Sequence, residues 1–190
     1  MAEASVLRWT PSGYELPSFP AVVPPAATDG HVEQARLVII GGGLTGLTLA
    51  ADLASRGIKA VLLDDDNSVG VRGASSRGMV WAQKTLEIMD RIGIAGRMIE
   101  KGVTWSVGRT LSDNEEVYTF NRAEENASSL PPFVNLQQFY VEWFLVERIV
   151  ELGNVELRWS NEVTGLRQEA DGVDLEVATE AGSYRMRAEW

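Results

Sequence analysis

Four residues stand out because their types and spacing could bind a phosphate and a sugar. Gly41, Gly43 and Gly46 follow an apolar run at GxGxxG spacing. Asp64 closes a second apolar run, close to the usual separation of about 20 residues from such glycines. Glycines in this turn let backbone N–H groups approach a pyrophosphate at a helix N-terminus, and the acid can accept a hydrogen bond from a ribose hydroxyl. The pattern predicts a dinucleotide site.

The elements around these residues agree with that prediction. The apolar runs 37–40 and 60–63 are typical of strands, and small apolar residues recur at helical spacing between them. Gly41 would supply the tight turn, Gly43 the close approach to phosphate, and Gly46 the close packing of helix on strand. The alternative is a glycine-rich turn in another kind of α/β protein, in which the acid is only a charge at a strand end.

Composition narrows the class of protein. The 190 residues are 45% hydrophobic, enough to bury a core, and 17 basic against 27 acidic side chains give a net charge of −10. That charge disfavours nucleic acid and anionic membrane surfaces as partners. The absence of cysteine excludes a thiolate metal site, and the single histidine, His31, lies outside the predicted core, which argues against a Ser-His-Asp hydrolase. We predict no metal site and assign no catalytic residue.

The N-terminal region differs in composition from the rest. Residues 1–35 hold five of the seven prolines, a density that opposes helix and sheet, so we expect an extension packed on the surface or a flexible leader. It shows no signal-peptide pattern, and no apolar run in the chain approaches the roughly 20 residues of a membrane helix. These features predict a soluble, cytoplasmic protein.

After Asp64 the sequence predicts a loop, 67–78, that carries Arg77. An arginine at this place could reach a phosphate or the ribityl chain of a bound nucleotide, or it could be an ordinary exposed loop residue.

The elements expected after this loop are helices over 80–92 and 136–152, strands over 103–110, 116–120 and 155–159, a loop over 121–133, and final strands over 162–168, 173–179 and 183–188. The turns between the last strands predict an antiparallel meander.

Several of these motifs together resemble one known family. They are the string GGGLTGLTLAADLASRG, the acid Asp64, Ser76-Arg77 ahead of Lys84-Thr85-Leu86-Glu87-Ile88, and Asn135-Leu136-Gln137-Gln138 ahead of Glu142 and Leu145. This combination resembles the FAD-dependent aromatic hydroxylases, which are single-component flavoprotein monooxygenases, and is most similar to the hydroxyphenylpropionate hydroxylase type. The resemblance extends over residues 37–190.

The resemblance implies a fold and a cofactor. The fold is α/β, with a Rossmann-like FAD-binding βαβ unit, a parallel sheet and an antiparallel β-meander at about 162–188, truncated before the substrate domain. The domain would be an incomplete FAD-binding domain over 36–190. The residues that would bind FAD are Gly41, Gly43, Leu44, Thr45, Gly46, Asp64, Arg77 and Gln138.

The resemblance also implies a reaction for the complete enzyme. NAD(P)H reduces FAD, and the reduced flavin uses O2 to hydroxylate a small phenolic substrate. Later family segments that hold the riboflavin and cover the substrate have no counterpart in these 190 residues, so we expect a piece that is inactive alone and that self-associates or pairs with a missing C-terminal half. Two alternatives remain: an NAD(P)-binding dehydrogenase half, which would continue into further βαβ units, and a non-enzymatic nucleotide-binding or interaction module.

Overall fold

The computed structural model describes residues 8–10, 13–70, 78–123 and 128–190. The chain divides into two compact units. The first consists of Met1–Ser75 and Leu145–Trp190, and the second of Ser76–Phe144. The predicted loop residue Arg77 and its neighbours Ser75 and Ser76 lie outside the described residues. Each unit is described below by itself.

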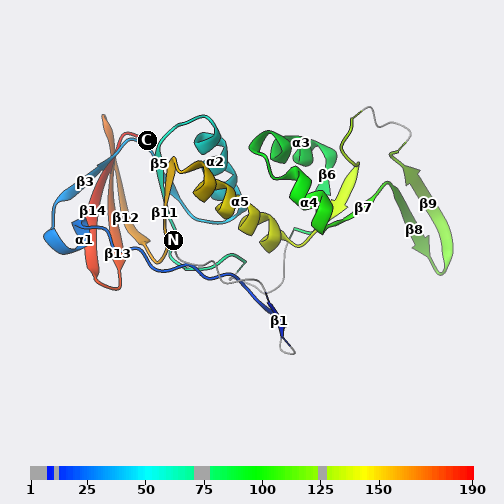
Figure 1. The fold of residues 1–190 in the computed structure, drawn as a ribbon, viewed down its shortest axis with the longest axis horizontal. Coiled ribbons are helices and arrows are strands. Elements are labelled where there is room, and N and C mark those ends of the chain that lie inside the picture. The colour runs from blue at the N-terminus through cyan, green and yellow to red at the C-terminus, as the bar shows by residue number, and fades with distance from the viewer. Residues whose placement is uncertain (1–7, 11–12, 71–77, 124–127) are drawn as a thin grey trace. The chain divides into compact units, whose positions relative to one another are not determined.

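The first unit contains the predicted βαβ arrangement (Figure 1). Strand β4 (Val38–Ile40) leads into helix α2 (Leu44–Ser55) and strand β5 (Ala60–Leu63), and β11 (Val155–Arg158) completes a parallel sheet of order β11-β5-β4. The helix buries Leu47, Ala50, Ala51 and Ala54, as their helical spacing predicts. Gly57 follows it with φ 72°, in the left-handed conformation that commonly terminates helices.

The predicted meander is confirmed by a second sheet in the same unit. Strands β12 (Glu162–Glu169), β13 (Gly172–Thr179) and β14 (Gly182–Ala188) pair antiparallel in sequence order. A small core beneath this sheet contains Ala26, Leu63, Leu175, Val177, Tyr184 and Met186. The chain then returns to the parallel sheet, because the Trp190 N–H donates to the Arg36 carbonyl at 3.1 Å and the Val38 N–H donates to the Trp190 carbonyl at 3.0 Å.

The N-terminal region is more regular than its prolines suggest. Strand β3 (Val32–Ala35) pairs parallel to β14 and forms the fourth strand of the meander sheet. The short elements β1 (Arg8–Thr10), β2 (Gly13–Glu15) and α1 (Ala26–Asp29) precede it. The expectation that this region lacks sheet was wrong for its last residues, because the five prolines of the region all precede α1 and each residue of β3 keeps its N–H donor.

The second unit contains a small antiparallel sheet and two helices. Strands β6 (Val80–Ala82), β10 (Phe133–Asn135) and β7 (Val103–Trp105) form a sheet of order β6-β10-β7. Helices α3 (Gln83–Ile92) and α4 (Ala95–Lys101) pack against each other, and α3 buries Leu86, Met89 and Ile92 on one face. Strands β8 (Val107–Ser112) and β9 (Glu115–Asn121) make a separate ribbon, and α5 (Gln138–Leu152) begins in this unit.

Three predicted boundaries in the second unit were wrong, each at a place where strand β10 pairs with a segment distant in the sequence. Residues 80–82, predicted as the start of a helix, form a strand because they pair with β10. Residues 133–135, predicted within or just after a loop, are that partner strand. The predicted strand 103–110 divides after Trp105, where β7 leaves β10 and β8 turns to pair with β9. In the described part of the chain, no helix is both long and apolar enough to cross a membrane.

Candidate dinucleotide site

Gly41 makes the turn between β4 and α2. Its φ is 101°, in the left-handed region that a side chain would strain, and its N–H donates to the Leu63 carbonyl of β5 at 2.8 Å. Gly46, one turn into the helix, packs against this glycine, and a Cβ at Gly46 would collide with the Gly41 carbonyl oxygen. The turn and the packing role expected of these two glycines are therefore both present.

Gly43 has a different environment. It is the N-cap residue of α2, with φ −77° and ψ −177°, a conformation that any residue can adopt. Among the described residues, no atom outside its chain neighbours lies within 4 Å of a Cβ built there, and no side chain caps the helix. The first N–H groups of a helix lack intrahelical partners. Among the described residues, open space and helix N–H groups without a side-chain cap thus coincide at this helix end, which suits a phosphate group.

Asp64, directly after β5, contacts the glycine turn. Its Oδ2 accepts a hydrogen bond from the Gly42 N–H, and its Oδ1 accepts one from the Asp66 N–H at 3.0 Å. Burial of the carboxyl raises its pKa, and the two backbone N–H donors oppose that effect only in part. The acid and the glycine turn, predicted as parts of one site, therefore lie together at the carboxyl ends of two adjacent strands, where open α/β sheets bind ligands.

The backbone of Asp64 is held by the strand beside it. Its N–H donates to the Arg158 carbonyl at 3.0 Å, and its carbonyl accepts from the Asn161 N–H at 2.7 Å. These bonds tie the end of β5 to the end of β11 (Figure 1). The position of the acid therefore depends on a strand that comes about ninety residues later in the chain.

A buried polar cluster lies at the same end of β11 and was not predicted. The Arg158 guanidinium, with its side chain 4% exposed, donates to Glu33 at 2.8 Å, to Glu156 at 2.8 Å and to the Tyr184 hydroxyl at 3.3 Å. That hydroxyl donates to Asn161 Oδ1 at 2.8 Å. Burial alone would lower the pKa of Arg158, but the hydrogen bonds from its partners outweigh burial and raise it. The sequence offered little signal for it, because Glu156 and Arg158 alternate with Val155 and Leu157 as charged residues do on the exposed face of a strand.

Gln138 lies at the start of α5, in the second unit. Its Oε1 accepts a hydrogen bond from the Gly78 N–H at 3.1 Å, and its Nε2 donates to Glu142 at 2.7 Å. Glu142 is buried, at 4% exposure. Gln138 therefore holds the residue that directly follows Arg77, which is itself outside the described residues. Within the described ranges, no group of three or more histidine or acidic side chains is arranged to hold a metal ion.

The fold and site define a dinucleotide-binding α/β protein with a Rossmann-like βαβ unit and a β-meander. A family model described as FAD binding domain matches residues 34–190. The chain belongs to this family of FAD binding domains.

Two curated relatives are similar over most of this chain. The para-nitrophenol 4-monooxygenase of Pseudomonas sp. (strain WBC-3) is 28% identical over 81% of this chain and 38% of its own length. The 3-(3-hydroxy-phenyl)propionate/3-hydroxycinnamic acid hydroxylase of Mycobacterium avium (strain 104) is 25% identical over 84% of this chain and 26% of its own length. The chain thus spans less than two fifths of either relative.

Solved structures agree with the fold. The p-nitrophenol 4-monooxygenase PnpA from Pseudomonas putida DLL-E4 superposes with a TM-score of 0.75 at 27% identity, covering 84% of this chain and 40% of that protein. The flavin-dependent monooxygenase PieE, solved in complex with FAD and substrate, gives a TM-score of 0.72 at 24% identity, covering 83% of this chain and 29% of that protein. The second likeness supports the fold alone. The predicted α/β fold class with its meander, and the predicted resemblance to FAD-dependent aromatic hydroxylases, are confirmed.

Proposed function

We propose that this chain is the FAD-binding part of an NAD(P)H-dependent monooxygenase that hydroxylates a small phenolic substrate. One observation supports the proposal most strongly. The open N-terminus of α2 at Gly43 and the carboxylate of Asp64 lie together at the ends of adjacent parallel strands. The relatives at 28% and 25% identity are named as a monooxygenase and a hydroxylase of phenolic compounds, which supports the substrate class.

Each site residue has a proposed task. The backbone from Gly41 to Gly46, including the N–H groups of Leu44 and Thr45, binds the pyrophosphate at the start of α2. The carboxylate of Asp64 accepts from a ribose hydroxyl. Arg77 and Gln138 contact the flavin nucleotide, as the resemblance of their motifs to the hydroxylase family implies. These tasks are binding and orientation, so none of these residues is a catalytic residue.

The bound FAD would supply the reaction of reduced flavin with O2, which inserts one oxygen atom into the phenolic ring while NAD(P)H provides two electrons and the second oxygen leaves as water. The residues of this chain hold the ADP half and place the flavin. Because the matched segment is a minor part of each relative, we assign hydroxylation to the complete protein and nucleotide binding to residues 1–190.

A dehydrogenase half is less well supported. Such a protein would continue after its third parallel strand into further βαβ units. Here β11 is followed by the antiparallel strands β12, β13 and β14, and the family match is to an FAD binding domain. A module without nucleotide binding remains the alternative against which the binding experiment is designed.

The test is a titration of purified 1–190 with FAD, followed by flavin fluorescence and isothermal calorimetry, with NAD titrated in parallel. We expect saturable FAD binding that Gly43→Asp abolishes and Asp64→Ala weakens. The matched control is Gly96→Asp, since Gly96 is an exposed glycine in the first turn of α4 and, like Gly43, has no described atom within 4 Å of a Cβ built there. A folded, monodisperse chain that binds no FAD would contradict the proposal, and tighter binding of NAD than of FAD would favour the dehydrogenase.

A further inference from the structure

Part of the N-terminal extension lies across the loops that follow β5 and β11. We call residues 16–22 the N-terminal strap. Ser18 forms an isolated antiparallel bridge with Ser68, and the Phe19 N–H donates to the Asn67 carbonyl at 2.7 Å. Further along, the Val22 N–H donates to the Trp159 carbonyl at 3.1 Å. The strap therefore has backbone bonds to both loops, although it precedes residue 34, where the family match begins.

Side chains of the strap and of the loop after β11 also contact each other. The ring of Phe19 stacks on that of Trp159, with centroids 4.7 Å apart and an angle of 15° between the planes. Trp159 is buried, at 4% exposure. Asn161 Nδ2 donates to the Val22 carbonyl at 2.8 Å, and Asn161 Oδ1 accepts from Tyr184. The strap is thus joined to the buried polar cluster at the end of β11.

The position of the strap relative to the nucleotide follows from the order of the sheet, β11-β5-β4. The pyrophosphate would bind at the glycine turn after β4, and the ribose at Asp64 after β5. A dinucleotide that continues in this direction carries its base toward the end of β11. The loops at that end, 64–68 and 159–161, are the ones that the strap crosses.

The same loops connect the strap to the acid. Asp66, whose N–H donates to Asp64 Oδ1, also accepts from the Ser160 N–H through its carbonyl at 3.0 Å. Asp66 Oδ1 accepts from the N–H of Ser68, the residue that is bridged to the strap. A short chain of hydrogen bonds therefore runs from the strap to the carboxylate that is expected to bind ribose.

We propose that the N-terminal strap closes the adenosine end of the site, packs against the purine base and fixes the Asp64 loop. This inference rests on the FAD site proposed above and goes beyond it, because it gives a binding task to residues outside the matched domain. The ligand class is a purine nucleotide with a diphosphate, so ADP alone contains the part that the strap contacts. Affinity for the flavin portion is independent of the strap.

The experiment compares chains that keep or lose the strap. Residues 1–15 are deleted in one, residues 1–22 in a second, and Phe19→Ala is made in the full chain, with Val23→Ala at an exposed neighbouring position as the matched control. FAD, ADP and FMN are titrated into each after circular dichroism has established folding. We expect deletion of 1–15 and Val23→Ala to change nothing, and deletion of 1–22 and Phe19→Ala to weaken FAD and ADP by about tenfold while leaving FMN unchanged.

Hydrogen exchange provides a second measurement. It uses only the unmodified chain, so it can be made even if a variant fails to fold. Bound FAD should slow exchange at the Phe19 and Val22 amides but not at the distant turn between β12 and β13. If the unmodified chain binds neither FAD nor ADP, that result contradicts both the proposed function and this inference. If it binds both, and the strap variants bind equally well or the strap amides exchange at the same rate, only the inference on the strap is overturned.

Discussion

At the scale of single residues, the glycines of the GxGxxG turn have different physical tasks. Gly46 is required by packing, since a Cβ there meets the Gly41 carbonyl oxygen, whereas Gly43 faces open space in an ordinary backbone conformation. The spacing in the sequence already predicts a packing task for Gly46 and a close approach to phosphate for Gly43. The tertiary structure adds the physical reason, because Gly46 packs directly on the Gly41 carbonyl while Gly43 has space beside it among the described residues.

Gly43→Ala should therefore affect mainly FAD binding, and Gly46→Ala mainly the stability of the fold. We expect Gly43→Ala to leave the free energy of unfolding within about 0.5 kcal/mol of the unmodified chain while weakening FAD binding about tenfold or more. We expect Gly46→Ala to lower the free energy of unfolding by about 3 kcal/mol, because the helix must move away from β4. Urea denaturation and FAD titration measure the two effects. Equal loss of stability in both variants would contradict this assignment.

The raised pKa of Asp64 predicts a pH dependence. Burial favours the protonated carboxyl in the ligand-free fold, so the contribution of Asp64 to stability is present at low pH and is lost as the pH rises from the ordinary carboxyl value through the raised pKa. Ribose binding needs the ionised carboxylate, so FAD affinity should fall as the pH is lowered through the same range. Calorimetric titration from about pH 4 upward, beginning at the ordinary carboxyl value, tests this prediction.

Asp64→Asn is the control for that titration. The substitution keeps the size of the side chain but removes the ionisation, so FAD binding should be weaker and should lose the part of its pH dependence that belongs to this carboxyl. A pH profile that is the same in the variant and in the unmodified chain would assign the dependence to another group.

The elements were predicted best where the pattern is local and worst where a partner is distant. The βαβ unit and the meander were found because each depends on short-range periodicity and turn residues. Strands β6 and β10 were missed because each has only three residues and is stabilised by pairing with the other, at a separation of about fifty residues. The same reason explains the unpredicted pairing of β3 with β14.

The Arg158 cluster joins three of these elements, β3, β11 and β14, and gives a prediction at this scale. Arg158→Met should lower the free energy of unfolding by about 3 kcal/mol, because Glu33 loses its bidentate partner and Tyr184 loses a donor in a buried setting. The matched control is Arg109→Met, since Arg109 pairs with Glu116 at the surface, where the side chains are 68% and 46% exposed. We expect its effect to stay within about 0.5 kcal/mol. Thermal and urea unfolding compare the two, and equal effects would contradict a structural role for the cluster.

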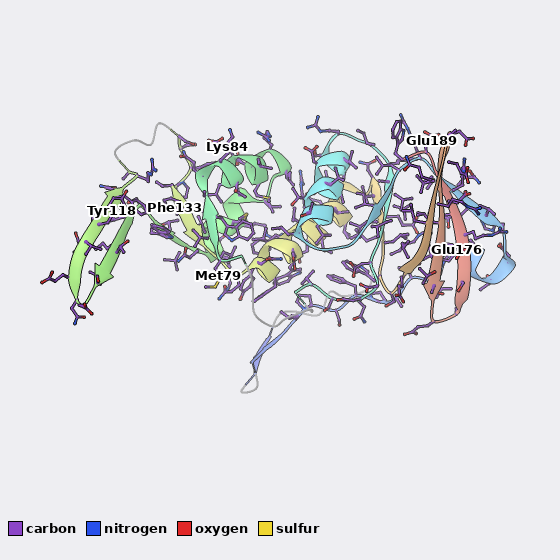
Figure 2. The ribbon with its side chains drawn as sticks, turned by 180° about the vertical axis from the view of Figure 1, so that it is seen from behind. Met79, Lys84, Tyr118, Phe133, Glu176 and Glu189 are labelled. Atoms are coloured by element: carbon purple, nitrogen blue, oxygen red, sulfur yellow. The ribbon has the colours of Figure 1, made fainter. Side chains whose placement is uncertain are left out.

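For the whole molecule, the exposed apolar surface of the ribbon β8–β9 predicts association. The ribbon has two strands only, and Leu111, Val117 and Tyr118 on it are 60% exposed or more. Figure 2 shows Tyr118 on this ribbon and Phe133 on β10, where the Phe133 ring stacks on Trp105 with centroids 4.3 Å apart. Two-stranded ribbons are marginally stable alone, and exposed apolar residues at unpaired edges favour contacts with other chains.

Sedimentation velocity over a range of concentrations tests this prediction. We expect residues 1–190 to self-associate, and Leu111→Thr combined with Val117→Thr to shift the equilibrium toward monomer without changing FAD affinity. Leu166→Thr is the control, because Leu166 is 61% exposed on the meander in the first unit. Monomer at every concentration in the unmodified chain, or an equal effect of the control, would contradict association through the ribbon.

The sequence by itself determined the glycine turn, the βαβ unit, the acid at the end of β5 and the meander, because each depends on residues close together in the chain. It also carried enough combined motifs to indicate the FAD-dependent hydroxylase family. The tertiary structure decided the contact of Asp64 with Gly42, the pairing of Arg158 with Glu33 across 125 positions, and the placement of the strap through Asn161 and Val22 across 139. Such contacts depend on how distant segments pack, and local periodicity contains no record of that packing.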